Sequence, residues 1–340
     1  MKNTNGTNGN GYLRRHGLIK VQQLTRPTID AIFAAADQVK QGHFDSQALR
    51  GKLMVVLFYE PSTRTKFSHE IAMAKLGGTV ISTDSARVFS SAAKGETIGD
   101  TFEVIGGYEP DIIVVRYDRK GELEEAQRRA GIPIINAGDG TGQHPTQALL
   151  DLFTIREKFG EIQGLHIAMV GDLKHGRTVR SLCYLIAKHF PGNIIHLVSP
   201  GPVRMREDVK KYMRKHNIEF HETESLDEVL PATDVLYETR VQDERYKKNP
   251  ALLAKVRQAS KRLIIGPATL TRMKSEAIIM HPLPRIDEIE RSVDADPRAW
   301  YFRQAKNGLF VRTPPLFFSH AILAPCFSQR LNQVNCRLEN

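Results

Sequence analysis

Four consecutive polar residues, Ser62-Thr63-Arg64-Thr65, follow an apolar stretch that ends near Phe58. Their hydroxyls and guanidinium, together with the N–H groups of a helix beginning here, would form a site for an anion such as phosphate. A plain helix cap needs only one Ser or Thr, so capping alone explains the run less well. The segment therefore predicts phosphate binding.

A second loop, Gly171 to Thr178, also has the pattern of a phosphate site. It differs from a nucleotide-binding P-loop only in carrying Arg177 where that motif has Lys. The P-loop Lys is a compact charge enclosed by backbone, and a guanidinium is too broad for that role. The sequence also offers no apolar strand ending in Asp that would hold magnesium. A nucleotide-hydrolysing protein is therefore kept only as the alternative from another enzyme class.

Short apolar, β-branched stretches alternate along the chain with longer amphipathic ones, which predicts βαβ units and parallel sheets. The expected strands are 52–58, 111–115, 132–135, 165–170, 194–198, 235–237, 263–265 and 277–280. The expected helices are 28–41, 66–76, 97–106, 145–158 and 178–189. The pattern runs twice, so two α/β domains are expected, with a boundary near the helix that begins at Pro145.

Polar residues directly follow most of these expected strands. They lie at 60–65, 116, 136–144, 171–177, 238–242 and 281–285. Loops after strands are polar in any case, but that explains less well why so many of these residues are Arg, His, Ser and Thr. Ligands of open parallel sheets bind at the carboxyl ends of the strands. We therefore expect one crevice between the two domains to collect these segments.

The bulk composition excludes several classes of protein. The chain has 340 residues, 41% hydrophobic and 25% charged, which is the balance of a soluble globular protein with room for two domains. No apolar run approaches the roughly 20 residues that cross a bilayer. The net charge of +10 favours anionic small substrates over nucleic acid, because the Lys and Arg residues are scattered. Residues 1–15 are expected to be a disordered lead-in and not a secretory signal.

The chain contains three cysteines, Cys183, Cys326 and Cys336, and no CxxC pair. This count argues against a disulfide framework or a zinc site, and it favours a reducing cytoplasm.

The Ser62-Thr63-Arg64-Thr65 motif resembles the carbamoyl-phosphate motif of the aspartate/ornithine carbamoyltransferase family. Further segments resemble that family in the same order: Asn136-Ala137-Gly138-Asp139-Gly140 leading to His144-Pro145-Thr146-Gln147, then Gly171 to Thr178, then His281-Pro282-Leu283-Pro284-Arg285. The resemblance covers roughly 17–312. It implies two Rossmann-like domains, each a parallel sheet flanked by helices, joined by interdomain helices. The carbamoyl-phosphate-binding domain would be 16–147 with 303–340 returning to it, and the aspartate-binding domain 148–302.

The resemblance also implies a reaction without metal or organic cofactor, in which an amine attacks the carbonyl carbon of carbamoyl phosphate. Ser62, Thr63, Arg64, Thr65 and Arg116 would bind the phosphate. Thr65, Arg116 and His144 would donate hydrogen bonds to the carbonyl oxygen, and Gln147 with the backbone carbonyls of Pro282 and Leu283 would orient the carbamoyl amide. Ser90 and Lys94, in a stretch that alone resembles a surface loop, would reach the site of a neighbouring subunit. The functional unit would then be a homotrimer.

The amino-acid substrate is expected to be L-aspartate, whose two carboxylates require guanidinium groups. Arg177 and the segment Arg240-Val241-Gln242 resemble the aspartate-type pattern, and the ornithine type usually carries Cys at the position of Pro282. The residues expected to hold aspartate are Lys94, Arg177, Arg240 and Gln242. The product would be N-carbamoyl-L-aspartate, an early intermediate of pyrimidine biosynthesis.

Glu60 is expected to latch a closed form by pairing with Arg177 and Arg245. If a Glu60→Gln variant still closes around a bisubstrate analogue, as measured by small-angle scattering, and stays active, this latch is excluded.

Several alternatives stay open beside this interpretation. They are an ornithine-type or other amino-acid carbamoyltransferase, and an inactive scaffold subunit of the same fold. The intact motif residues argue against the scaffold. Binding to nucleic acid or to a membrane is not expected. The sequence does not decide whether a regulatory chain joins a larger assembly.

The C-terminal region departs from the family at Thr313-Pro314-Pro315, because two prolines disfavour a helix that runs through them. We expect either a new helix after Pro315 or an altered end in 316–340. His175 stands where the family often has Tyr.

Overall fold

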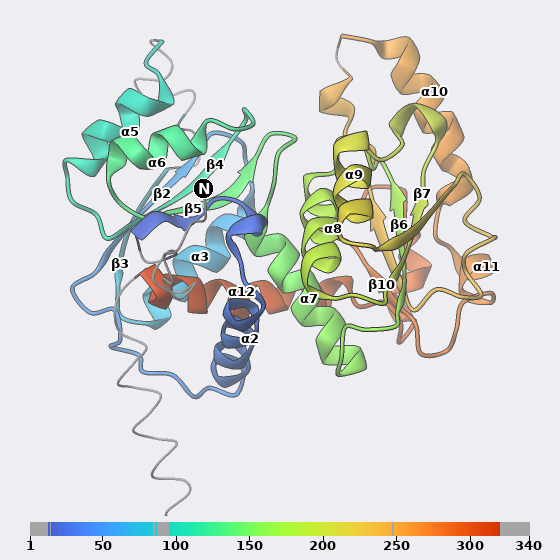
Figure 1. The fold of residues 1–340 in the computed structure, drawn as a ribbon, viewed down its shortest axis with the longest axis horizontal. Coiled ribbons are helices and arrows are strands. Elements are labelled where there is room, and N and C mark those ends of the chain that lie inside the picture. The colour runs from blue at the N-terminus through green and yellow to red at the C-terminus, as the bar shows by residue number, and fades with distance from the viewer. Residues whose placement is uncertain (1–12, 14, 84–85, 87–94, 247, 320–340) are drawn as a thin grey trace, which may run out of the picture. The chain divides into compact units, whose positions relative to one another are not determined.

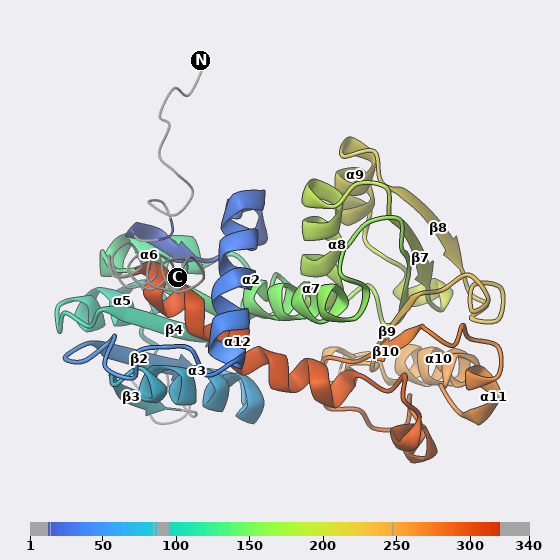
Figure 2. The ribbon, with the colours of Figure 1, turned by 90° about the horizontal axis from the view of Figure 1, so that it is seen from below.

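The computed structural model describes residues 13, 15–83, 86, 95–246 and 248–319. Most of the expected lead-in, the tail beyond Ser319, and the predicted site residues Ser90 and Lys94 lie outside the described residues. The chain forms two compact units (Figures 1 and 2). The first lies within Met1–Gly140 and Gly308–Asn340, and the second is Thr141–Asn307.

Each unit is built on a five-stranded sheet whose strands are all parallel. In the first unit the strands are β1 (Gly17–Leu18), β2 (Leu53–Phe58), β3 (Thr79–Thr83), β4 (Ile112–Tyr117) and β5 (Ile134–Asp139), in the order β1-β5-β4-β2-β3. In the second they are β6 (His166–Gly171), β7 (Ile194–Val198), β8 (Glu219–Thr223), β9 (Val235–Thr239) and β10 (Ile278–Met280), in the order β10-β9-β6-β7-β8. The predicted fold class, parallel α/β sheets in two units, is confirmed.

Helices connect the strands. The helices of the first unit are α2 (Arg26–Lys40), α3 (Thr63–Lys75), α5 (Ile98–Gly106) and α6 (Leu123–Ala130). Those of the second are α7 (Pro145–Phe159), α8 (Arg177–His189), α9 (Glu207–Lys215), α10 (Pro250–Ser260) and α11 (Pro267–Leu270), and the last helix is α12 (Tyr301–Ser319). Short 3-10 helices lie at η1 (Val21–Gln23), η3 (Gly201–Val203), η4 (Asp243–Arg245), η5 (Lys261–Leu263) and η6 (Arg291–Ala295).

The sheet of the first unit is covered on both faces. Successive strand residues point to opposite faces, so an uninterrupted apolar strand supplies two cores. In β4, Val115 packs in one core with Phe102 of α5, and Val114 packs in the other with Met73 of α3. Helices α5 and α6 contact each other over the first of these faces (Figures 1 and 2). This arrangement leaves the carboxyl ends of the strands to carry the polar loops.

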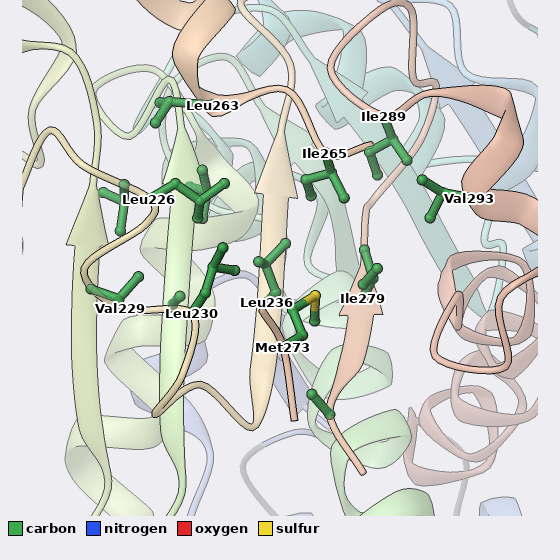
Figure 3. Close-up of a cluster of buried hydrophobic side chains, with 14 of the residues drawn as sticks. Leu226, Val229, Leu230, Leu236, Leu263, Ile265, Met273, Ile279, Ile289 and Val293 are labelled. Atoms are coloured by element: carbon green, nitrogen blue, oxygen red, sulfur yellow. The ribbon is translucent and has the colours of Figure 1, made fainter. Parts of the chain in front are cut away.

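The second unit has its own apolar core on one face of its sheet (Figure 3). There Leu236 of β9 and Ile279 of β10 pack with Leu230, Ile265 and Met273, all of them buried. The neighbouring residue in β9, Tyr237, therefore points to the opposite face, where its hydroxyl donates to a carboxylate of α7.

One predicted strand, 263–265, is wrong. Leu263 ends the 3-10 helix η5, and Ile265 makes only an isolated bridge to Ile289. Both residues are buried in the apolar core of the second unit, so their apolar character reflects burial and not a place in the sheet. Periodicity alone does not separate these two causes.

The expected helix break at Pro314 and Pro315 is also wrong, because α12 runs through both residues to Ser319. A proline's fixed φ suits a helix, and its cost is the lost N–H and a clash with the preceding turn. The turn before the prolines is firmly anchored. Val311 is fully buried, the Arg312 guanidinium donates to Ser68 Oγ at 2.8 Å, and Thr313 Oγ1 donates to the carbonyl of Leu309 at 2.8 Å.

A buried histidine of the first unit should make the fold sensitive to acid. His69 in α3 is fully buried, and its Nδ1–H donates to the carbonyl oxygen of Thr65 at 2.8 Å. Burial, with the charge of Arg312, lowers the pKa of His69 to about 3. The unfolded chain takes up this proton near pH 6.5, so the stability contributed by neutral His69 is complete above about pH 6.5 and is lost as the pH falls towards 3.

We expect protonation of the unfolded-state histidine to remove about 3 kcal/mol from the free energy of unfolding between pH 7.5 and pH 4.5. A His69→Phe variant should lack this part of the loss. Urea titrations of both proteins at the two pH values measure it. An equal loss in the two proteins would show that His69 is not responsible.

Candidate active site

The polar run 62–65 lies at the start of α3, directly after β2. Ser62 precedes the helix in an extended conformation, with φ of −164°, and its side chain makes no capping hydrogen bond. Plain capping, the alternative open at the sequence level, is therefore not the role that Ser62 has here. Thr65 is buried, whereas Thr63 and Arg64 are exposed. The first turn of α3 thus combines side-chain donors with the positive end of a 13-residue helix.

Strand register brings Arg116 to the same edge of the sheet. Phe58 at the end of β2 pairs with Arg116 near the end of β4, and the N–H of Tyr59 donates to the Arg116 carbonyl at 2.8 Å. The guanidinium donates from Nη1 to the carbonyl of Ala137 at 3.2 Å, and its Nη2 lies 3.6 Å from Glu60 Oε2. The first unit therefore collects Glu60, the 62–65 run and Arg116 at the carboxyl ends of neighbouring strands.

In the second unit, His144 and Gln147 lie at the start of α7. His144 precedes the first helical residue, and its side chain is 3% exposed. Its backbone N–H donates to Ser181 Oγ at 2.9 Å, and Ser181 Oγ donates to the carbonyl of Arg177 at 2.9 Å. Gln147, in the first turn of the helix, donates from Nε2 to Asp151 Oδ1 at 2.9 Å.

The loops after β6 and β9 meet each other. Gly171 pairs with Thr239, and a Cβ at Gly171, whose φ is +104°, would lie 2.1 Å from the carbonyl oxygen of Thr239. Beyond these strands, Gln242 Nε2 donates to the carbonyl of His175 at 3.1 Å. Arg177, the first residue of α8, follows two positions later. The structure thus brings the Arg177 loop and the Gln242 loop together.

Arg240 is held by a carboxylate of its own loop. Its Nη2 donates to Glu244 Oε1 at 2.6 Å and its Nη1 to Glu244 Oε2 at 3.1 Å. These hydrogen bonds raise the pKa of Arg240. The guanidinium is therefore charged and oriented before any substrate binds.

Sequence reasoning missed a buried group that fixes these two loops. The Tyr246 hydroxyl donates to Asp172 Oδ2 at 3.0 Å, and His175 Nδ1 lies 3.1 Å from both Asp172 Oδ1 and the Tyr246 oxygen. Burial raises the pKa of Tyr246, so its hydroxyl stays protonated as a donor. The only sequence signal for Asp172 is its place inside the Gly171 loop, and Tyr246 gives none.

The loop after β10 carries the backbone carbonyls of Pro282 and Leu283. The Leu283 N–H donates to His281 Nδ1 at 2.7 Å, and His281 Nε2 lies 2.8 Å from Glu288 Oε1. Because Nδ1 accepts, the proton of neutral His281 lies on Nε2 and is donated to Glu288. Leu283 has a left-handed φ of 55°, and the Leu283–Pro284 peptide is cis.

The predicted site residues therefore gather within each unit. The first unit holds Glu60, Ser62, Thr63, Arg64, Thr65 and Arg116, and the second holds His144, Gln147, Arg177, Arg240, Gln242, Arg245, Pro282 and Leu283. In the part of the chain that the structure describes, no three His, Cys, Asp or Glu residues are grouped so as to hold a metal ion. Nor is any described helix long and apolar enough to cross a membrane.

The chain belongs to the aspartate/ornithine carbamoyltransferase family. Residues 15–157 match the family's carbamoyl-P binding domain, and residues 163–317 match its Asp/Orn binding domain.

Individual relatives are of the aspartate type. A chloroplastic aspartate carbamoyltransferase of Arabidopsis thaliana is 50% identical over 298 residues, which are 87% of this chain and 75% of that protein. Aspartate carbamoyltransferase 1 of Pisum sativum, also chloroplastic, is 48% identical over 87% of this chain and 76% of its own length. The structure of aspartate transcarbamoylase from Trypanosoma cruzi in complex with carbamoyl phosphate and aspartate has a TM-score of 0.83 and 39% identity, and covers 91% of this chain and 97% of that one.

Proposed function

We propose that this protein transfers the carbamoyl group of carbamoyl phosphate to L-aspartate, which gives N-carbamoyl-L-aspartate and phosphate. The observation that carries the substrate assignment is the pairing of two loops in the second unit. The Gln242–His175 hydrogen bond joins the loop of Arg177 to that of Arg240, and Arg240 is already oriented by Glu244. Two guanidinium groups, Arg177 and Arg240, carried by these joined loops would match the two carboxylates of aspartate.

We assign the phosphate of carbamoyl phosphate to the first unit. Its ligands would be Ser62, Thr63, Arg64, Thr65 and Arg116. Ser62 directly precedes α3 without a capping hydrogen bond from its side chain, and the next three residues form the first turn of that helix. Lys94 and Ser90 of a neighbouring subunit would complete this site. The domain ranges 16–147 with 303–340 for carbamoyl phosphate and 148–302 for aspartate stay part of the proposal, although the compact units divide a few residues away, after Gly140 and after Asn307.

The reaction itself needs positioning and charge stabilisation. The neutral amine of aspartate attacks the carbonyl carbon, a C–N bond forms, the C–O bond to phosphate breaks, and the departing phosphate takes the amine proton. Negative charge grows on the carbonyl oxygen, where Thr65, Arg116 and His144 would donate hydrogen bonds. The remaining rate enhancement comes from holding the two anionic substrates close together and correctly oriented. The latch of Glu60 with Arg177 and Arg245 stays a prediction.

The homotrimer is part of the proposal. Large apolar side chains are exposed on α3 and on the edge strand β3, which contact each other: Phe67 is 51%, Ile71 45% and Ile81 59% exposed. Such exposure fits burial against another copy of the chain. We also propose cytoplasmic residence, which the buried free thiol of Cys183 suits, and a role in pyrimidine biosynthesis.

A carbamoyl-transfer assay on purified protein tests the function. The protein is first sized by light scattering, where the mass of three chains is expected, and is then given carbamoyl phosphate with L-aspartate or L-ornithine. We expect product with aspartate only. Product with ornithine would keep the family and overturn the amino-acid assignment. A folded trimer that forms neither product would favour the inactive scaffold subunit.

A further inference from the structure

Asp151 of α7 lies at the centre of a buried hydrogen-bond network. Its carboxylate is completely buried and accepts from three side chains. Gln147 Nε2 and Gln304 Nε2 donate to Oδ1 at 2.9 and 2.7 Å, and the Tyr237 hydroxyl donates to Oδ2 at 2.8 Å. Burial, with the charge of Asp151, raises the pKa of Tyr237 well above its ordinary value, so this hydroxyl stays a donor.

The network has a fixed direction that begins at the main chain. The backbone N–H of His281 donates to Gln304 Oε1 at 2.8 Å. A backbone N–H can only donate, so Gln304 must turn its Nε2 towards Asp151. A carboxylate can only accept, so Gln147 must also turn its Nε2 towards Asp151. The Gln147 amide oxygen consequently lies on the side of the amide away from Asp151.

We propose that Asp151 is a positioning residue, which turns the Gln147 amide oxygen towards the bound acyl phosphate and so makes the site select a carbamoyl over an acetyl group. This inference rests on the proposed function and deepens it. The amino group of a carbamoyl moiety donates hydrogen bonds, and an oriented amide oxygen accepts them. The methyl group of acetyl phosphate donates none, so the acceptor would stay unsatisfied.

The same network reaches the other acceptors assigned to the carbamoyl amino group. His281 directly precedes Pro282 and Leu283, whose backbone carbonyls would accept hydrogen bonds from the carbamoyl amino group. Its N–H is held by Gln304, and its imidazole accepts from the Leu283 N–H. One buried chain of hydrogen bonds thus connects the side-chain acceptor of α7 with the backbone acceptors after β10.

The direction of the network can be reversed without a change of shape or net charge. In a D151N/Q304E variant, the new carboxylate at 304 still accepts from His281, but its other oxygen now needs a donor. The new amide at 151 must supply its NH₂ there, which forces Gln147 to turn its oxygen inwards and its NH₂ towards the substrate. In D151N alone, Gln304 still requires an acceptor, so the direction is kept and the new NH₂ faces the Tyr237 oxygen.

The experiment compares kcat/KM for carbamoyl phosphate and for acetyl phosphate, with aspartate as acceptor. With acetyl phosphate the amine displaces phosphate to give N-acetylaspartate, with the same bonds made and broken. We expect D151N to keep the preference for carbamoyl phosphate within about threefold, and D151N/Q304E to lose about tenfold or more of it. The loss should come mainly from kcat/KM of carbamoyl phosphate.

A matched control lies on the same helix. Thr154 is also buried, donates to the carbonyl of Leu150 and accepts from Asn307, but none of these bonds leads to Gln147. T154V should lower the unfolding temperature and leave the preference unchanged. An equal loss of preference in T154V would mean that general loosening is responsible, and it would overturn the proposal.

Two outcomes separate this proposal from the proposed function. Failure of the unchanged protein to carbamoylate aspartate would refute the function. Transfer by the unchanged protein, with full preference kept in a folded D151N/Q304E, would refute only the role of Asp151. If the double variant does not fold, D151L gives the second test, because it leaves Gln147 without its acceptor. A preference unchanged in D151L would refute the role equally.

Discussion

Replacing His144 by Ala is expected to lower kcat about 10²- to 10³-fold, with little change in the KM of either substrate. His144 is buried at the start of α7, and the Ser181 hydroxyl holds its backbone. A donor aimed at the carbonyl oxygen gains most of its strength as that oxygen becomes an anion, so its loss affects the transition state more than the bound substrate. Steady-state kinetics with each substrate varied in turn measure the effect.

The control for this variant is a side chain that keeps a donor. A His144→Asn variant should recover part of the lost kcat, because its amide NH₂ can still donate, although from a shorter side chain. Thermal unfolding of both variants should match that of the unchanged protein. A higher KM for carbamoyl phosphate with little change in kcat would instead show that His144 binds the substrate in its ground state.

Replacing Arg240 by Leu is expected to reduce kcat/KM for aspartate about 10²- to 10³-fold, because a buried carboxylate of the substrate would lose its charged partner. The effect should fall on aspartate, and the KM of carbamoyl phosphate should change little. Arg240→Lys should restore little activity, since an ammonium cannot make two parallel hydrogen bonds to one carboxylate.

Glu244→Gln provides the matched control for Arg240. It leaves the guanidinium in place but removes the charge that orients it through two hydrogen bonds. We expect a loss of about tenfold in kcat/KM for aspartate, between the unchanged protein and Arg240→Leu. Equal losses for both substrates in Arg240→Leu would show that the residue maintains the fold of the loop and does not bind aspartate.

The fold was predictable for most strands that are both buried and formed by a run of apolar residues. The central strands β2, β4, β6 and β7 are apolar on both faces, and their sequence pattern predicts them within two residues. The edge strands β3 and β8 were missed because most of their side chains are exposed, so Thr79–Thr83 and Glu219–Thr223 show no apolar run. The 263–265 segment shows the opposite error, since it is buried and apolar without pairing into a strand.

The sequence could propose only those candidate site residues that lie in short motifs. Ser62 to Thr65, His144 and Arg240 lie in short motifs whose spacing carries the chemistry. The groups that orient them are joined across long stretches of chain, as Tyr237 and Gln304 are to Asp151, 86 and 153 residues apart. No local pattern contains such pairs, because they exist only after the strands and helices have packed.

The hydrogen bond from the His281 N–H to Gln304 also constrains how this sequence can change. Only proline lacks that N–H, so almost no substitution at 281 removes the starting point of the chain of donors and acceptors. A lineage could reverse the Gln147 amide by changing Asp151 first and Gln304 second, since the D151N intermediate keeps the acceptor that the Gln304 and Gln147 amides donate to. The other order passes through two adjoining buried carboxylates, which repel each other and have no donor between them. The single variant D151N is therefore expected to be more stable than the single variant Q304E. The double change is accessible only when the substitution at 151 comes first.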